Sequence, residues 1–174
     1  MTALDKKYHI QTGTNNPILR TISEKVDVID PETRQFCQDL IKLMRKNKWV
    51  WIAAPQVGKN IRVIVTTQRE TRKKEDKLVS ETIMINPEII EKSKDLVIRE
   101  EACISLPDVL WLVKRHKAIT VTYQDTKGNT FKKKFKDFNA IIIQHEIDHL
   151  EEILFTDKLI KTRNSPQKTK KPSL

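Results

Sequence analysis

The sequence predicts an α+β fold in which a mostly antiparallel sheet packs around a central helix near the C-terminus. Three observations carry this prediction. A helical pattern begins at Pro31, several runs rich in β-branched residues follow it, and a second helical pattern begins at Asn139. Strands that succeed one another between two helices, with a clear hairpin among them, favour antiparallel pairing.

The first helix is expected to begin after Asp30, the N-cap, and to end near Asn47. Proline at the first helical position and an acidic N-cap are typical helix-start signals. One apolar face follows at helical spacing, formed by Phe36, Cys37, Leu40, Ile41 and Met44. Cys37 is therefore expected to be a small core residue and not a reactive thiol.

The middle of the chain reads as strands. Residues 61–67 are rich in β-branched side chains and predict a strand, whereas the charged residues 69–77 predict a loop or hairpin tip. Residues 82–86 are expected to form the returning strand, stopped by Pro87, and residues 95–100 to form another.

A second hairpin is expected from strands at 118–124 and 130–135 around a turn at 127–129. Its second strand carries Lys132, Lys133, Lys134 and Lys136. Lysines on a strand discourage pairing with other chains, so a solvated sheet edge is the main interpretation and a phosphate-contacting patch the alternative.

The last helix is expected from Asn139 to about Ile153. Its inward face combines apolar residues with two histidines: Ile141, Ile142, His145, His149 and Ile153.

Length and composition limit the class of protein. The 174 residues predict a single domain over 1–160, followed by a basic, disordered tail at 161–174. Apolar runs stay well short of the roughly 20 residues of a membrane span, and the start of the chain has no signal-peptide pattern. Two cysteines exclude a disulfide framework, so we expect a reducing cytoplasm.

The formal charge of +10 favours an anionic partner. Six positive charges and no acidic residue follow Asp157, so much of the excess belongs to the tail. The tail therefore serves solubility or, as the functional alternative, docks on the ribosome.

The strongest chemical signal is the run from His145 to His149, which has the form HExxH. Positions i and i+4 of a helix project in nearly the same direction, so the two imidazoles can bind one metal. Glu146 is turned about 100° from His145 and can take a proton from a water that the metal has made acidic. The alternative is a pair of ordinary core or surface histidines.

A catalytic metal needs a third protein ligand. Downstream, Glu151 and Glu152 are too near in sequence, and otherwise only Asp157 precedes the basic tail. The ligand should therefore come from upstream, from Cys103, His116, His9 or Cys37. Cys103 is favoured because a strand is expected to end there in a loop, and a metal would keep its thiol deprotonated. Two histidines, one cysteine and an open position suit Zn(II) or Fe(II).

Residues 52–58 are expected to form a tight, exposed turn after the first helix. Gln56 in this turn can donate its amide to a developing oxyanion. A purely structural turn is the alternative.

Taken together, three segments resemble the peptide deformylase family. Residues 53–56 read AAPQ, residues 101–105 read EACIS against the family's EGCLS-like segment, and residues 144–150 read QHEIDHL. Their order and spacing agree with the family, and the resemblance covers about residues 15–160. It implies the deformylase fold and removal of the N-terminal formyl group from formyl-methionyl nascent peptides.

The resemblance also implies a role for individual residues. Cys103, His145 and His149 hold one divalent metal, most often Fe(II), with Zn(II), Ni(II) or Co(II) also admitted. Glu146 is the general base and acid. Gln56 and the backbone N–H of Ile104 stabilise the oxyanion.

The sequence departs from the family in its substrate groove. Trp49 and Trp51 replace the glycines of the G-x-G-L lead, a stretch that pairs with the substrate backbone like an added strand. The implied substrate contacts are Val50, Trp51, Glu101 and Ala102, the last replacing a glycine. The indoles either narrow the groove, form a wall for the methionine side chain, or are core aromatics.

Two other functions are weighed against deformylation. A catalytically weak paralogue could keep the metal as a structural staple and bind ribosome or RNA, but Glu146 argues against it because a structural site needs no base. A zinc endopeptidase is disfavoured by the missing downstream ligand. No membrane partner is expected.

Overall fold

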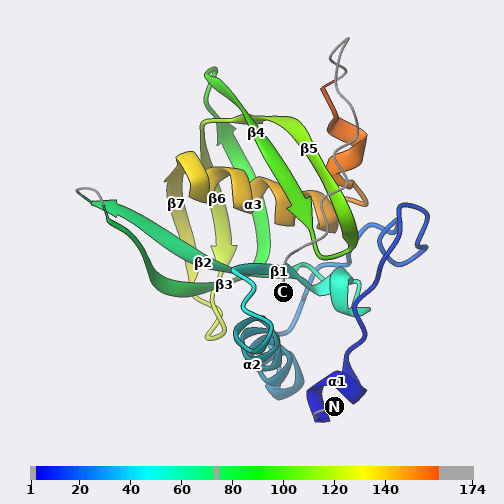
Figure 1. Ribbon diagram of the computed structural model, residues 1–174. Coiled ribbons are helices and arrows are strands. Elements are labelled where there is room, and N and C mark those ends of the chain that lie inside the picture. The colour runs from blue at the N-terminus through cyan, green and yellow to red at the C-terminus, as the bar shows by residue number, and fades with distance from the viewer. Residues whose placement is uncertain (1–2, 73–74, 161–174) are drawn as a thin grey trace.

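The computed structural model describes residues 3–72 and 75–160, and it confirms the α+β class (Figure 1). Its helices are α1 (Ala3–Lys7), α2 (Pro31–Lys46) and α3 (Asp137–Leu150), with short 3-10 helices η1 (Ala54–Val57) and η2 (Phe155–Lys158). Its strands are β1 (Trp51–Ala53), β2 (Val63–Arg72), β3 (Glu75–Lys92), β4 (Leu96–Cys103), β5 (Leu106–His116), β6 (Ala118–Gln124) and β7 (Thr130–Lys136).

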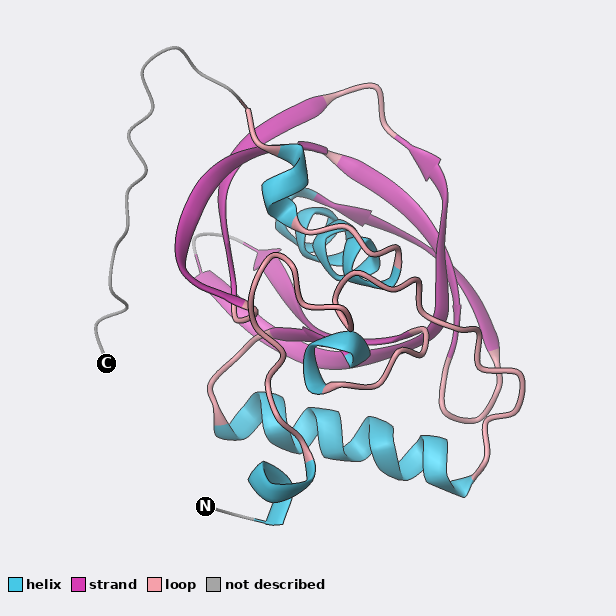
Figure 2. Ribbon diagram, turned by 90° about the vertical axis from the view of Figure 1, so that its right-hand side faces the viewer, coloured by secondary structure: helices cyan, strands magenta, loops and turns pink. Residues whose placement is uncertain are grey.

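The strands form two antiparallel sheets that curve around α3. Five strands pair in the order β1-β2-β3-β6-β7, and β4 pairs with β5. Figure 2 shows the strands wrapped around α3, while α2 lies outside them. Every residue of α3 from Ala140 to Leu150 is buried, because this helix is covered on all sides. The prediction of a sheet packed around a central helix is confirmed.

The helix bounds agree with the sequence at three of four ends. α2 begins where the carboxylate of Asp30 accepts a hydrogen bond of 2.7 Å from the backbone N–H of Thr33. α3 ends at Leu150, so Ile153, expected on its inward face, lies beyond the helix and is only half-buried.

Cys37 is buried on α2, and burial raises the pKa of its thiol to about 11, which confirms the core assignment.

Pro87 does not stop a strand, and that prediction is wrong. β3 continues through it to Lys92, with a shift of register between Ile85 and Glu88. A bulge tolerates proline because the missing N–H falls where no ladder bond is required. Asn86 makes the bulge possible: it has φ of 52° and its side chain replaces ladder partners by bonding Val26 N and O, both at 2.9 Å, and Gln124 at 3.1 Å.

Two other stretches differ from the prediction. The strands β2 and β3 extend over most of 69–77, which the sequence predicts to be a loop, and residues 73 and 74 lie outside the described part. The sequence does not predict β5 at all. Pro107 and Asp108, which has φ of 67°, interrupt the pattern at its start and hide the alternation that follows.

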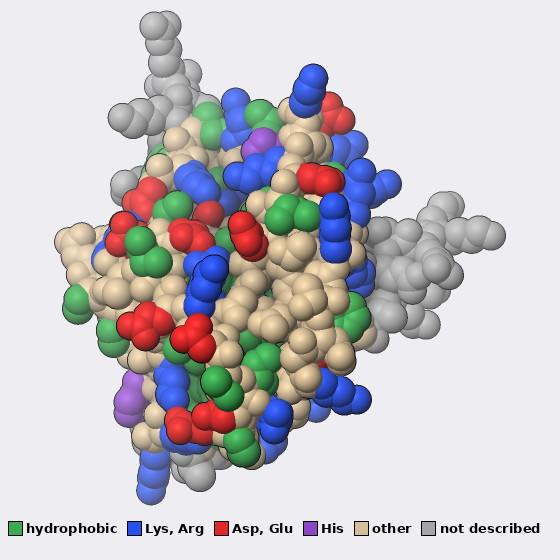
Figure 3. All heavy atoms as spheres, turned by 180° about the vertical axis from the view of Figure 1, so that it is seen from behind, with side chains coloured by type: hydrophobic (Ala, Val, Ile, Leu, Met, Phe, Trp, Pro, Cys, Tyr) green, Lys and Arg blue, Asp and Glu red, His purple; other side chains and the backbone are tan. Residues whose placement is uncertain are grey.

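The hairpin of β6 and β7 agrees with its prediction almost residue for residue. β7 is an edge strand, and its lysines are exposed while Phe135 points inward. Figure 3, the reverse side of the molecule, has Lys and Arg side chains gathered along the margin that carries this strand. The solvated-edge prediction is therefore confirmed.

No helix in the described residues is long and apolar enough to cross a membrane. The predicted tail at 161–174 lies outside those residues. A single domain over 1–160 and a disordered tail both remain predictions.

The bulge at Asn86 gives a stability prediction. Asn86→Ala removes its side-chain bonds and leaves a Cβ at positive φ, so urea unfolding should show a loss of roughly 2–4 kcal/mol. Asn86→Gly loses the same bonds but tolerates the backbone, and should cost about 1 kcal/mol less. Equal losses in the two variants would show that the positive φ is not strained.

Candidate metal centre

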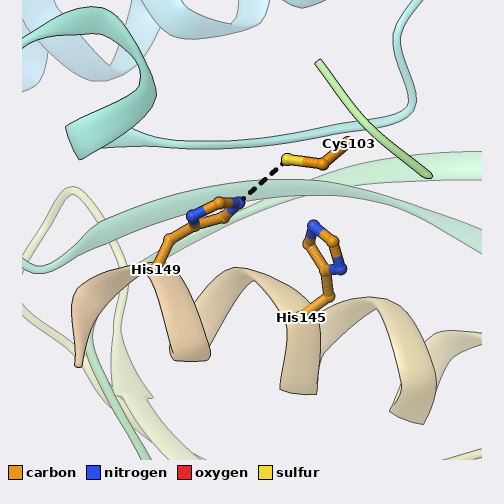
Figure 4. Close-up of side chains that lie close together, drawn as sticks. All are labelled: Cys103, His145 and His149. Atoms are coloured by element: carbon orange, nitrogen blue, oxygen red, sulfur yellow. Dashed lines mark hydrogen bonds between the residues drawn. The ribbon is translucent and has the colours of Figure 1, made fainter. Parts of the chain in front are cut away.

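Three side chains from two distant segments meet inside the protein. His145 and His149 project from one face of α3, one helical turn apart, toward Cys103 at the end of β4 (Figure 4). Their donor atoms all lie within 4.8 Å of one another, and all three residues are buried. Cys103 Sγ lies 3.2 Å from His149 Nε2.

The structure therefore selects one of the four candidate third ligands. Cys37 lies in the core under α2, and the ring Nδ1 of His116 bonds the backbone oxygen of Ser93 at 2.7 Å. His9 is exposed near the start of the chain.

The donors at this centre fit a metal. Among the described residues, His145 Nε2 is buried without a hydrogen-bond partner, although it points toward Cys103. A buried polar atom with no partner is costly unless an ion or water satisfies it. Two imidazoles and a thiolate form the donor set that Zn(II) and Fe(II) accept, with a position left for a reactant.

The electrostatics of the cluster favour the ligand form of Cys103. Burial by itself raises the pKa of the thiol, but the nearby imidazoles of His149 and His145 lower it well below its usual value. Burial lowers the pKa of His145, yet the nearby thiol of Cys103 and the hydrogen bond to Glu101 raise it to about 10. Metal binding here is thus coupled to loss of a proton from the imidazole.

Glu146 lies at the same centre. Its carboxylate is fully buried, has no hydrogen-bond partner among the described residues, and lies 3.9 Å from His145 Nε2. Burial raises its pKa to about 7, because the nearby imidazoles compensate only part of the lost hydration. A carboxyl group with such a pKa can both accept and donate a proton near neutral pH.

Gln56 reaches the centre from η1, between β1 and β2. Its Oε1 accepts from Ala53 N at 2.9 Å, and its Nε2 donates to Cys103 Sγ at 3.3 Å and to Ser105 Oγ at 3.2 Å. The orientation of the amide is therefore fixed. The prediction of an exposed turn is wrong, since every residue from Ile52 to Val57 is buried. Ile104 adjoins the centre because it follows Cys103 directly.

Glu101 lies behind His145 and not in an open groove. Its side chain is 6% exposed, and its Oε2 accepts from His145 Nδ1 at 2.8 Å. Burial by itself raises the pKa of this carboxyl, but hydrogen bonds from Arg115 and His145 lower it to about 2. The carboxylate is thus fully engaged, and only the backbone of Glu101 is left for a peptide.

The ring of His145 also stacks on Phe155 of η2, with centroids 5.9 Å apart.

Sequence reasoning overlooks the residues that hold Glu101. Arg115 of β5 donates to both oxygens of Glu101, at 2.7 and 2.8 Å, and also to Asp148 of α3. Lys158 of η2 donates to both oxygens of Asp148, at 2.6 and 2.7 Å. Arg115 shares the inward face of β5 with Val113, and this alternation is the one sequence signal that marks it as buried.

The two tryptophans that replace family glycines have different surroundings. Trp49 is half-buried and packs against the core cluster under α2. Trp51 of β1 faces α3, where its ring meets Phe138 edge to face with centroids 6.0 Å apart. Val50 is half-buried between them, and Ala102 on β4 is exposed.

A helix-borne histidine pair, a thiolate, a buried carboxylate and a fixed amide donor together define a mononuclear hydrolase centre. Comparisons with known proteins agree. The profile of the polypeptide deformylase family matches residues 8–165. A peptide deformylase of Desulfotalea psychrophila is 36% identical over 155 residues, 89% of each chain.

Solved structures give the same result. The class I type b peptide deformylase of Acinetobacter baumannii, bound to Met-Ala-Ser, has a TM-score of 0.80 and 31% identity over 87% of this chain and 98% of that one. A probable peptide deformylase of Synechococcus phage S-SSM7 has a TM-score of 0.77 and 38% identity. The match covers 87% of this chain and 99% of the phage protein. The chain belongs to the peptide deformylase family. The alternative of a non-catalytic paralogue finds no support in these comparisons.

Proposed function

We propose that this protein hydrolyses the N-terminal formyl group from formyl-methionyl peptides of nascent proteins. The observation that carries the proposal is the buried carboxylate of Glu146, which has no partner among the described residues and lies beside three donor atoms that fit a metal. A structural metal site has no use for such a carboxylate.

Cys103, His145 and His149 would hold the metal, for which we propose Fe(II), with Zn(II), Ni(II) or Co(II) as substitutes. A divalent metal bound there polarises a carbonyl oxygen and makes a water molecule acidic near neutral pH. The thiolate and open position suit Fe(II). Metal analysis of protein isolated without oxygen tests this choice, and Zn(II) as the main ion in fully active protein would contradict it.

Glu146 moves the proton in this proposal. Its carboxylate takes a proton from the attacking water and later gives it to the amine that leaves when the formyl C–N bond breaks. A pKa near 7 suits both transfers.

Gln56 and Ile104 supply the oxyanion donors. The amide of Gln56 is held by Ala53 and Ser105, so the N–H that lies toward Cys103 Sγ is kept at the centre, where it can donate to the developing oxyanion. The backbone N–H of Ile104 is the second donor. Each donor of this kind lowers the barrier by about 2.7–4 kcal/mol in other hydrolases.

The peptide groove is proposed to run between β1 and the end of β4. Val50 and Trp51 line one side, and the backbones of Glu101 and Ala102 line the other. Phe138 precedes His145 by seven residues, about 10 Å along α3, so the pair it makes with Trp51 can wall off the methionine side chain.

The role of Glu146 is tested with Glu146→Gln, which keeps its size but removes the base. Release of formate from a formyl-Met tripeptide should fall roughly 10²- to 10⁴-fold. The protein should still bind one metal per chain, which separates loss of the base from loss of the centre. Wild-type turnover by this variant would contradict the assigned role.

The wall formed by Trp51 is tested with Trp51→Gly. Losing its contact with the methionine side chain should raise KM for a formyl-Met tripeptide about tenfold or more and leave kcat near the wild-type value. Trp51→Phe keeps an aromatic wall and should behave like the wild type. A fall in kcat at constant KM would place Trp51 outside the substrate contacts.

We also propose a cytoplasmic location and a ribosome contact through the basic tail at 161–174. Two free thiols suit a reducing compartment, and nascent peptides occur at ribosomes. Deleting the tail should abolish co-sedimentation with ribosomes at low salt, while release of formate from a free tripeptide persists. Unchanged co-sedimentation would contradict the ribosome contact.

A further inference from the structure

We propose that Lys158 is a positioning residue for the metal centre, acting through the charge of Asp148 and the guanidinium of Arg115. The inference rests on the proposed function, since it concerns the metal that Cys103, His145 and His149 would hold. Lys158 lies in η2, outside the three segments that carry the resemblance to the family.

A chain of ionic hydrogen bonds runs from solvent to the centre. The ammonium of Lys158, on a side chain 38% exposed, bonds both oxygens of Asp148. Asp148 accepts from Arg115, Arg115 donates twice to Glu101, and Glu101 accepts from His145 Nδ1. Every side chain in this series of hydrogen bonds except that of Lys158 is largely buried.

When His145 is neutral, as a metal-bound imidazole is, the charges of the other members balance only if Lys158 is counted. Glu101 and Asp148 supply two negative charges, and Arg115 by itself supplies one positive charge between them. In a poorly hydrated region both carboxylates compete for that guanidinium. Lys158 satisfies Asp148 from the solvent side, which leaves both Nε and Nη2 of Arg115 on Glu101.

The consequence for His145 is geometric. A metal-binding imidazole is oriented by the partner of its other nitrogen, and here that partner is Glu101. Without Lys158, Asp148 draws Arg115 toward itself, Glu101 loses one of its two restraints, and the ring of His145 is less well held. The effect should appear in metal affinity before it appears in folding, because the Lys158 side chain lies at the surface.

The test uses the full chain loaded with Co(II), whose absorption bands report the ligand set, and measures affinity by competition with a chelator. Lys158→Met should weaken Co(II) binding severalfold, less than the roughly 10- to 100-fold that follows loss of a direct partner of a metal ligand. Lys158→Arg should restore it. Lys114→Met removes another exposed lysine, next to Arg115 in the sequence, and should leave affinity unchanged.

The route through Asp148 has its own test. In an Asp148→Asn background no carboxylate competes for Arg115, so adding Lys158→Met should change Co(II) affinity less than twofold. An undiminished loss in that background, or wild-type affinity in Lys158→Met alone, would overturn the inference. Failure of the wild type to bind Co(II) would instead overturn the proposed metal centre itself.

Discussion

The guanidinium of Arg115, held between two carboxylates inside the protein, is the interaction on which the rest of the centre depends. It joins β5 to Glu101 of β4 and to Asp148 of α3. A buried ion pair adds little net stability compared with apolar packing, but loss of one partner costs about 3–5 kcal/mol because the other charge stays buried. The contribution of Arg115 is therefore mainly positional. It fixes the carboxylate that orients His145, and it links the second sheet to the helix that carries both histidines.

The sequence was sufficient to predict the histidine pair and the carboxylate that the structure places at the centre, because their constraints are local. The spacing of His145 and His149 is a property of one helical turn, and Glu146 lies between them. Spacing by itself only favoured Cys103 among four candidates, since its approach to α3 depends on how β4 packs, and the family resemblance was needed to select it. Arg115 and Lys158 were beyond sequence reasoning for the same reason: basic residues are mostly exposed, and only tertiary structure brings these two to Asp148.

The secondary structure likewise divides into elements that local sequence signals predict and elements that long-range contacts decide. α2, the hairpin of β6 and β7, and most of α3 follow from caps, turns and periodicity within each segment. The errors lie where a long-range contact overrides a local signal. Pro87 stays within β3 because Asn86 bonds a loop 60 residues earlier in the chain. The segment at 52–58 resembles a surface turn, yet α3 and β2 enclose it because β1 pairs with β2 directly before it.

The two edges of the five-stranded sheet differ in their openness to association. The β7 edge carries exposed lysines in a strand that is otherwise well formed, so a second strand approaching it would have to desolvate several like charges. The β1 edge is only three residues long and carries no charge. An extended chain that approaches the β1 edge therefore meets no charged side chain of that strand. The lysines also oppose pairing of two copies through β7, because such pairing would bring the lysines of both copies together.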